Sequence, residues 1–304
     1  KIKGYVMRKY FTLSSTIKDV LNDEHLKDFS RLLFPIDLNT PDYLTLGEIS
    51  NSKYFVWYSN IKADQTIEIL NYLKNEVING HQVYYPIYSN NQIEEDTSRN
   101  NVGLFFFRGK AFEKFALMCA GGGFMYVASM HDSFPHALFA SQKGYNSFAL
   151  IYRVDHPYED CVQAIHYIIN HSEQLKVRKD EYSLWGGSAG ARIAAQCGNK
   201  NFFKRLSNRV DITSAVAVIL QYTGYSNVSI NDAPTYACCG TLDKIASYIM
   251  MQQRHYELQR LGINSEFHAY DGLEHGFGLG IDTVAEGWII DALCFWDAQT
   301  KKPK

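Results

Sequence analysis

The sequence lacks the features of nucleic-acid-binding and membrane-spanning proteins. Its 304 residues carry a formal net charge of −2, with no long basic run. A nucleic-acid binder would show a basic stripe or patch, so we do not expect this class. No apolar run approaches the length of a transmembrane helix. No signal peptide is visible, although removal of a leader before Lys1 stays open.

Cysteine is scarce and follows no metal-binding or disulfide-framework pattern. There are six cysteines, without a CxxC pair or a Cys/His spacing typical of zinc sites. Several lie within apolar segments, which is typical of buried free thiols. We therefore expect a reducing, cytoplasmic compartment, and we expect neither a metal nor a cofactor.

Internal repeats, low-complexity segments and flexible linkers are also missing. Hydrophobic residues make up 46% and charged residues 20%, which is typical of a globular protein with a full core. The length allows one large α/β domain or two small ones. The first hundred residues differ in pattern from the rest. We expect residues 1–100 to form a helical extension, packed on a core of residues 101–304 within one structural domain.

The extension has its own predicted elements. Ser14 or Ser15 is placed to cap a helix that ends at Leu33. Apolar residues recur at helical spacing over residues 64–77, which predicts a second helix. The segment before residue 90 is extended, and residues 90–101 are predicted to form a polar loop.

From residue 102 onward, short apolar strands alternate with helices. Strands are expected at residues 102–107, 115–119, 147–152, 182–185, 215–220, 235–239 and 266–270. Helices are expected near residues 136–142, 158–175, 189–197, 246–261 and 285–296. Continuous apolar strands indicate a sheet that is buried on both faces. The predicted fold class is therefore α/β, with a mostly parallel central sheet, helices on both faces and a helical N-terminal extension.

One pentapeptide between a predicted strand and a predicted helix is typical of a nucleophile elbow. Residues 186–190 read Gly-Gly-Ser-Ala-Gly, with Ser188 at the centre. Such a serine lies on a sharp turn with its hydroxyl above the sheet, and the flanking glycines allow the close packing. The pattern alone arises by chance in roughly one chain in ten of this size. Its value depends on the residues around it.

A base and an acid follow Ser188 in the order expected for a catalytic triad. Serine becomes a nucleophile when a histidine removes its proton and a carboxylate orients that histidine. Asp243 follows the strand that ends near residue 239, and His275 follows the strand that ends near residue 270. Because the carboxyl ends of parallel strands meet at one edge, these side chains are expected to converge. Other acids are less suitable: Asp232 precedes its strand, and Asp271 lies too close in sequence to His275.

A third requirement is a set of donors for the negative oxygen of a tetrahedral intermediate. The glycine triplet at residues 121–123 follows an early buried strand, so its bare amides can approach a substrate carbonyl. The amide of Ala189, next to Ser188, would complete the oxyanion hole.

These motifs together resemble the serine esterases of the α/β-hydrolase superfamily. The similarity is closest to bacterial acetyl-esterase/lipase-like enzymes and the carbohydrate-ester esterases grouped with them. It covers roughly residues 100–300 and rests on the motifs at residues 120–124, 185–190, 240–243 and 273–277. The resemblance implies an α/β-hydrolase fold and the following site: Ser188 as nucleophile, Asp243 as acid, His275 as base, and Gly122, Gly123 and Ala189 as oxyanion donors.

One departure from the family pattern concerns the residue before the glycine triplet. The family often has histidine there, and this chain has Ala120. That histidine usually organises the loop without taking part in the chemistry. The sequence therefore predicts retained activity but leaves the support of the loop open.

The substrate follows less directly from the sequence. Phe124, Tyr126 and Tyr222 are predicted to line an aromatic acyl- or sugar-binding wall, although core packing explains them about as well. Because no large cap is visible, we expect a small-molecule ester with a short acyl group, such as an acetylated carbohydrate. Two alternatives stay open: a serine peptidase of the prolyl-oligopeptidase type and a non-catalytic binding protein on a hydrolase scaffold. The oligomeric state is not predicted.

Overall fold

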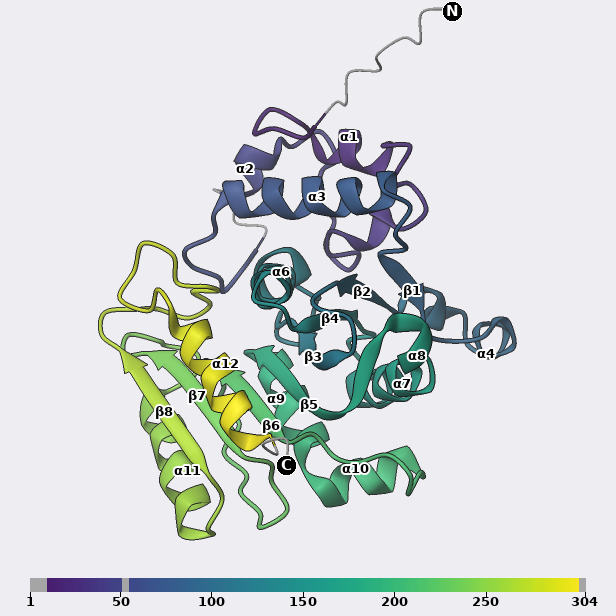
Figure 1. Cartoon of the computed structure of the whole chain (residues 1–304). Coiled ribbons are helices and arrows are strands. Elements are labelled where there is room, and N and C mark those ends of the chain that lie inside the picture. Colours follow the sequence, from purple (N-terminus) through teal and green to yellow (C-terminus); the bar gives the residue numbers. More distant parts are fainter. Residues whose placement is uncertain (1–9, 51–54, 301–304) are drawn as a thin grey trace, which may run out of the picture.

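In this computed structural model, the central sheet lies between two layers of helices (Figure 1). The structure describes residues 10–50 and 55–300, and the following elements belong to these ranges. The strands are β1 (Tyr84–Pro86), β2 (Gly103–Phe107), β3 (Glu113–Cys119), β4 (Asn146–Ile151), β5 (Val177–Gly187), β6 (Ala217–Gln221), β7 (Thr235–Gly240) and β8 (Ser265–Tyr270). Their spatial order is β1-β2-β4-β3-β5-β6-β7-β8.

The sheet is mostly parallel, as predicted. The strands from β4 to β8 in the spatial order run parallel to one another, whereas β2 pairs in antiparallel fashion with both β1 and β4. Every residue of β2, β4, β6 and β7 is buried. This burial explains their mainly apolar sequences, because a strand covered on both faces has no solvent-exposed side. The edge strand β8 is only partly covered and carries polar residues.

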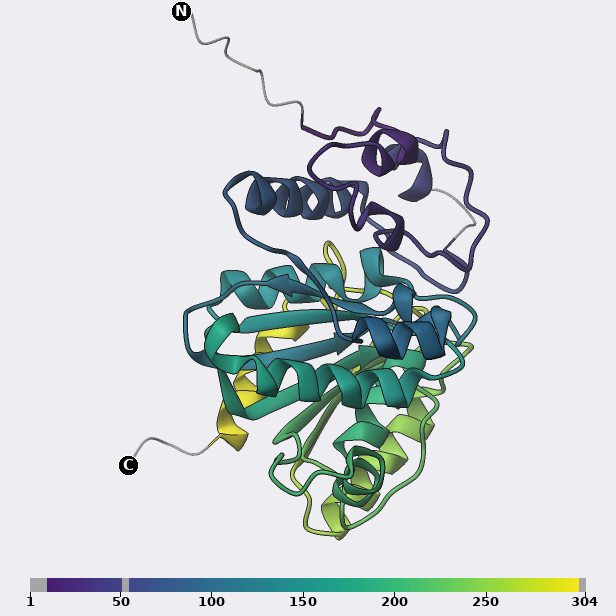
Figure 2. The same ribbon diagram turned by 90° about the vertical axis from the view of Figure 1, so that its right-hand side faces the viewer.

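Helices cover both faces of the sheet. They are α1 (Ile17–Leu21), α2 (Leu46–Ser50), α3 (Ala63–Ile78), α4 (Asn90–Glu95), α5 (Ser129–Asp132), α6 (Phe134–Gln142), α7 (Pro157–Asn170), α8 (Ser172–Leu175), α9 (Ala189–Gly198), α10 (Lys200–Ser207), α11 (Tyr248–Arg260) and α12 (Trp288–Gln299). Helices α6 and α12 lie on one face, and α7, α9 and α11 lie on the other (Figures 1 and 2). The prediction of an α/β fold with helices on both faces is thus confirmed. None of the helices in the described ranges is long and apolar enough to cross a membrane.

The N-terminal extension forms a separate layer beside α6, with α3 packed against α5 and α6 (Figure 2). The predicted boundary at residue 100 is too late, because β1 already pairs with β2 in the central sheet. The long helix predicted to end at Leu33 is also wrong. Thr16 and Asp19 form a capping box that starts α1, which ends at Leu21. A short 3-10 turn over Ser30–Leu32 follows later.

Residues 90–101 are not the predicted polar loop. Ser89 and Gln92 form a capping box that starts α4, and Asp96 caps a 3-10 helix over Thr97–Asn101. The predicted helix over residues 158–175 is divided into α7, which ends at Asn170, and α8. The turns that start α1, α4 and the 3-10 helix depend on side-chain hydrogen bonds, which apolar periodicity does not register.

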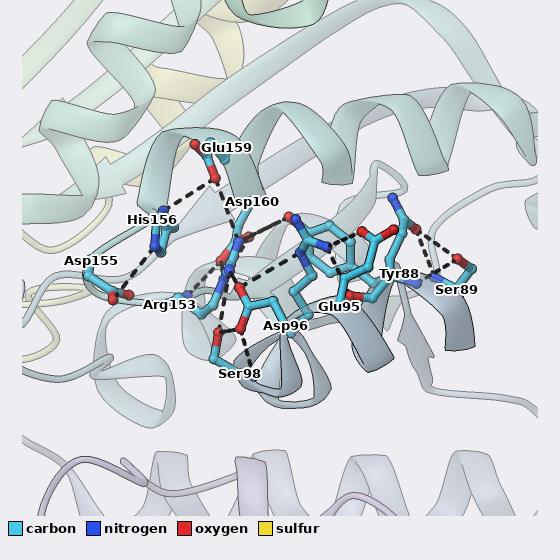
Figure 3. A network of polar contacts seen from close by, with 12 residues as sticks. Tyr88, Ser89, Glu95, Asp96, Ser98, Arg153, Asp155, His156, Glu159 and Asp160 are labelled. Carbon is cyan, nitrogen blue, oxygen red and sulfur yellow. Dashed lines mark hydrogen bonds and ion pairs between the residues drawn. The ribbon is translucent and has the colours of Figure 1, made fainter.

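A buried ion-pair network fastens this part of the extension to the core (Figure 3). Arg153 follows β4, and its guanidinium lies 2.7 Å from Asp160 in the first turn of α7. The same guanidinium binds Asp96 at 2.6 Å, and the Tyr88 hydroxyl donates to Asp160 at 2.5 Å. Asp160 is fully buried, so its charge depends on these partners. The network holds residues 88–98 against the carboxyl end of β4.

Candidate active site

Ser188 lies on a strained turn between β5 and α9. Its backbone angles are φ 53° and ψ −119°, a region that costs free energy for a residue with a Cβ. The neighbouring glycines make the turn sterically possible. A Cβ on Gly186 would lie 2.2 Å from the carbonyl carbon of Gly190, and a Cβ on Gly190 would lie 2.0 Å from the Cys119 carbonyl oxygen. The turn therefore requires small residues on both sides, and it presents the Ser188 hydroxyl at the carboxyl end of β5.

The structure brings Ser188, His275 and Asp243 together. His275 Nε2 lies 3.0 Å from Ser188 Oγ, and His275 Nδ1 lies 2.7 Å from Asp243 Oδ2. Ser188 follows β5, Asp243 follows β7 and His275 follows β8. The carboxyl ends of these strands lie along the same edge of the sheet. His275 and Asp243 are buried, whereas Ser188 is half-buried and reaches a cavity. This is the geometry in which a histidine can take a proton from a serine hydroxyl.

The second oxygen of Asp243 is fixed by the backbone. Asp243 Oδ1 accepts hydrogen bonds from the amides of Ile245 at 2.8 Å and Ala246 at 2.7 Å. Amide donors stabilise the charged carboxylate and prevent its rotation. Asp243 is thereby held with Oδ2 facing His275, which orients the Nδ1–H toward the acid and leaves Nε2 for Ser188.

The glycine triplet turns beside Ser188 with amides available. Gly122 has φ +127° and Gly123 has φ +64°, values that favour glycine. A Cβ on Gly122 would lie 2.0 Å from the Tyr126 carbonyl oxygen. Within residues 10–50 and 55–300, neither the Gly122 amide nor the Gly123 amide has a hydrogen-bond partner. Ala189 is the first residue of α9, and its amide has no partner within the helix.

A buried carboxylate that the sequence analysis did not identify lies beneath this loop. Asp132, the last residue of α5, is 3% exposed. Its Oδ2 accepts hydrogen bonds from the Gly121 amide at 2.7 Å and from the Tyr58 hydroxyl at 2.9 Å. Its Oδ1 accepts from the Tyr222 hydroxyl. A Cβ on Gly187 would lie 2.5 Å from both carboxylate oxygens, so Asp132 also contacts the elbow.

The two tyrosines stay protonated and serve Asp132 as donors. Burial, and then the nearby Asp132 charge, raise the pKa of Tyr58 and of Tyr222 well above the ordinary value for tyrosine. The Tyr222 ring also lies 5.0 Å from the His275 ring, centroid to centroid. Asp132 thus connects the glycine triplet, the turn at Ser188 and, through Tyr222, the surroundings of His275. The sequence analysis left open what supports the glycine triplet when Ala120 replaces the family's histidine, and Asp132 provides this support.

Gln221, at the end of β6, joins the elbow to the histidine loop. Its carbonyl accepts the Ser188 amide at 3.0 Å, and its side-chain amide donates to the Gly278 carbonyl at 2.9 Å. His136 Nε2 lies 2.8 Å from Gln221 Oε1, and burial lowers the pKa of His136 to about 4. A neutral His136 donating from Nε2 therefore fixes the orientation of Gln221.

The N-terminal extension reaches the active site through residues 57–60. Ser59 binds the histidine loop twice: its amide donates to the Gly276 carbonyl at 3.1 Å and its hydroxyl to the His275 carbonyl at 2.8 Å. Tyr58 donates to Asp132, and a Cβ on Gly123 would meet the Trp57 ring at 2.8 Å. The extension is therefore part of the site's framework. No motif marks this segment in the sequence, because its contacts are all long-range.

A cavity of about 400 Å³, here called the active-site cavity, opens at Ser188 and His275. Phe124 and Tyr222 line it, as expected for an aromatic wall. Tyr126 is not among its lining residues, which corrects the prediction for that residue. The side chain of Tyr126 is buried, with its hydroxyl donating to the Val56 carbonyl at 2.6 Å and its ring stacked near Trp57. The turn at Gly122 and Gly123 directs it away from the cavity. Within the described ranges, no group of three His, Cys, Asp or Glu side chains is placed to hold a metal ion.

Replacing Asp132 with asparagine tests its role in positioning the loop. An asparagine keeps the size but loses one acceptor oxygen, so either the Gly121 amide or a tyrosine hydroxyl loses its partner. We expect kcat for p-nitrophenyl acetate to fall about tenfold, with KM nearly unchanged, because the oxyanion donors act in the transition state. Steady-state kinetics measures this split, with the Asp271→Asn variant as an exposed control. An unchanged kcat with a lowered melting temperature would show that Asp132 serves stability alone.

Comparison with known proteins is consistent with this geometry. The BD-FAE family model matches residues 109–254, slightly less than half of the chain. No curated protein matches the sequence. An acetyl ester-xyloside bifunctional hydrolase from Caldicellulosiruptor lactoaceticus superposes with a TM-score of 0.61 at 19% identity, covering 71% of this chain and 95% of that chain.

Two further solved structures show the same fold. A thermophilic esterase from Thermogutta terrifontis, with propionate bound, has a TM-score of 0.57 at 17% identity, covering 67% of this chain and 92% of that chain. An α/β-hydrolase from a Medee basin deep-sea metagenome library has a TM-score of 0.55 at 20% identity, covering 65% of this chain and 92% of that chain. These structures show that the chain has the α/β-hydrolase fold, and the family-model match over residues 109–254 supports the resemblance drawn from the sequence motifs.

Proposed function

We propose that the protein is a serine hydrolase that cleaves carboxylic esters of short acyl groups. One observation carries the proposal: His275 contacts both Ser188 Oγ and Asp243, beside a loop with two amides that lack partners in the described part of the chain. The strained elbow supports it, because such backbone strain is concentrated at functional sites. A hydrolase scaffold that only binds a ligand has no need of this arrangement.

In the first half of the reaction, Ser188 attacks the ester carbonyl. His275 Nε2 takes the hydroxyl proton as the new Oγ–C bond forms, and Asp243 stabilises the resulting imidazolium. The negative charge on the former carbonyl oxygen is stabilised by the amides of Gly122, Gly123 and Ala189. The bond to the alcohol oxygen then breaks, His275 donates its proton to this leaving group, and an acyl-enzyme on Ser188 results.

In the second half, water releases the acyl group. His275 takes a proton from the attacking water, and the oxyanion forms again in the same hole. The bond between Oγ and the acyl carbon breaks, and His275 returns its proton to Ser188. The products are a carboxylic acid and the free enzyme. These steps use only side chains and amides of the chain itself.

The cavity supports a short acyl group and a polar alcohol. Its volume of about 400 Å³ is near the lower end of the range for small-molecule sites, and it must hold both parts of the ester. Thr223, Ser226 and Asn227 add polar groups to its wall. The structural relatives include an acetyl ester-xyloside hydrolase and an esterase with bound propionate. We propose acetylated carbohydrates as the substrate class to test first.

A series of p-nitrophenyl esters tests the acyl preference. We expect kcat/KM to be highest for acetate to butyrate and to fall about tenfold or more by octanoate, because longer chains exceed the cavity. Release of p-nitrophenolate measures the rates, and release of acetate from acetylated xylose derivatives tests the alcohol side. A maximum at decanoate or longer would contradict the short-acyl proposal.

The peptidase alternative is tested with the matched amides. Acetyl-p-nitroanilide and short proline-containing peptide p-nitroanilides carry an amide in place of the ester and release p-nitroaniline, which is also followed by its absorbance. We expect ester turnover to exceed amide turnover by orders of magnitude, because no feature of the cavity favours the poorer leaving group. Faster cleavage of peptide anilides would favour the peptidase.

A further inference from the structure

Arg192 is the cationic side chain of the active-site cavity, and the triad mechanism does not use it. It lies four residues after Ser188 in α9, and its amide donates to the Ser188 carbonyl at 3.3 Å. Both side chains, together with His275, line the active-site cavity.

Two partly buried tyrosines, Tyr158 and Tyr225, lie close enough to Arg192 for its charge to act on their hydroxyl groups. In both tyrosines burial raises the pKa, and the Arg192 charge acts in the opposite direction. Within residues 10–50 and 55–300, no carboxylate forms an ion pair with Arg192. A guanidinium has five donors, so most of them stay available to a ligand.

A second arginine beside the same cavity wall shows the contrast. Arg254 lies beneath the wall, 4% exposed, where it binds Asp232 at 3.2 Å and the Asn227 carbonyl at 3.0 Å. Its guanidinium also lies 5.3 Å from the centre of the Tyr225 ring. Arg254 therefore acts structurally by fixing the loop that carries Tyr225 and Asn227. Arg192 is exposed to the cavity that this loop forms.

We propose that Arg192 binds an ionised carboxylate carried by the ester substrate, so that the preferred substrates are half-esters of dicarboxylic acids or esters of carboxylate-bearing alcohols. This inference rests on the proposed ester hydrolysis at Ser188. The planar guanidinium matches a carboxylate in a two-pronged hydrogen bond. Because Ser188 and Arg192 line the same cavity, one small bifunctional substrate can reach both side chains. Thr223, Ser226 and Asn227 offer hydrogen bonds to the rest of such a polar molecule.

Two matched pairs of esters test the proposal and distinguish the two sides of the substrate. Mono-p-nitrophenyl succinate and p-nitrophenyl butyrate differ in a charge on the acyl group. 4-Acetoxybenzoate and its methyl ester differ in a charge on the alcohol. The variants are Arg192→Gln, which removes the charge, and Arg192→Lys, which keeps it. Arg205→Gln on α10 is the matched control, because it removes an exposed charge that does not line this cavity.

We expect Arg192→Gln to lower kcat/KM about tenfold for one of the two anionic esters, mainly through KM. The neutral partner ester should be unaffected, and Arg192→Lys should restore part of the loss. A loss for the succinate ester places the carboxylate on the acyl side, and a loss for acetoxybenzoate places it on the alcohol side. Equal rates for all four esters in wild type and Arg192→Gln, or an equal loss for all four, would overturn the inference. Turnover of the neutral esters by the wild type reports separately on the proposed function, and its absence would overturn both.

Discussion

Replacing Ser188 with alanine lowers kcat for p-nitrophenyl acetate by about four to six orders of magnitude, in our expectation. Without Oγ, no acyl-enzyme forms, and His275 has no hydroxyl to deprotonate. In a triad that acts as a unit, loss of the nucleophile costs nearly as much as loss of all three members. The residual rate reflects binding and oxyanion stabilisation of direct water attack. Release of p-nitrophenolate by purified variants measures the effect.

Ser226 offers a matched control for this experiment. It lies in the wall of the same cavity but has no contact with His275 among the described residues. Ser226→Ala should keep a kcat for p-nitrophenyl acetate close to that of the wild type, because this ester lacks the polar alcohol that we propose Ser226 contacts. The Ser188→Ala variant should unfold at about the same temperature as the wild type, because alanine also carries a Cβ and keeps the same backbone strain. Wild-type turnover by Ser188→Ala would refute the assignment.

Replacing Asp160 with alanine should lower the free energy of unfolding by about 3 to 5 kcal/mol. Asp160 is fully buried, and both of its oxygens bind Arg153, including the Arg153 amide at 2.7 Å. Its removal leaves the guanidinium, which is 5% exposed, without its main counter-charge. Urea unfolding monitored by circular dichroism gives the change. Asp155→Ala is the control, because that carboxylate is largely exposed on the loop between Arg153 and α7.

A double variant separates the ion pair from simple loss of packing. Arg153→Met combined with Asp160→Leu removes both charges and keeps side-chain volume. We expect it to be more stable than Asp160→Ala, because the cost of the single variant is an uncompensated buried charge. If the double variant were less stable than Asp160→Ala, side-chain packing at this position would contribute more to the free energy of unfolding than charge compensation, contrary to this account.

The parts of the protein that the sequence predicts are those governed by periodicity and strand order. Apolar runs identify the buried strands, and the parallel arrangement places the loops after β5, β7 and β8 along one edge. For this reason Ser188, Asp243 and His275 can be named before the structure is known. Their catalytic roles stay a proposal, but their convergence follows from the fold. The glycine triplet is recognisable because glycine adopts the positive φ values found at Gly122 and Gly123 more readily than other residues.

The parts that escape sequence reasoning depend on long-range contacts. Asp132 is one acid in an unremarkable segment, and its importance comes from Tyr58, 74 residues earlier, and Tyr222, 90 residues later. Residues 57–60 carry no motif, yet Ser59 reaches across 216 residues to the His275 carbonyl. The prediction that Tyr126 lines the cavity is wrong, because closeness in sequence to the glycines does not decide on which side of the loop a side chain lies. In each case the missing information is the packing of the extension on the core.

The central claim is that Ser188 is the nucleophile, and covalent labelling tests it most directly. Paraoxon is a phosphate ester that reacts with activated serine nucleophiles and releases p-nitrophenolate. The same reagent applied here should form one bond between Ser188 Oγ and phosphorus, with release of one p-nitrophenolate per chain. Intact-protein mass spectrometry should show a single diethylphosphoryl group in the wild type and in Ser226→Ala, located by peptide mapping at residue 188, and none in Ser188→Ala. An unlabelled wild type, or equal labelling of the Ser188→Ala variant, would contradict the account.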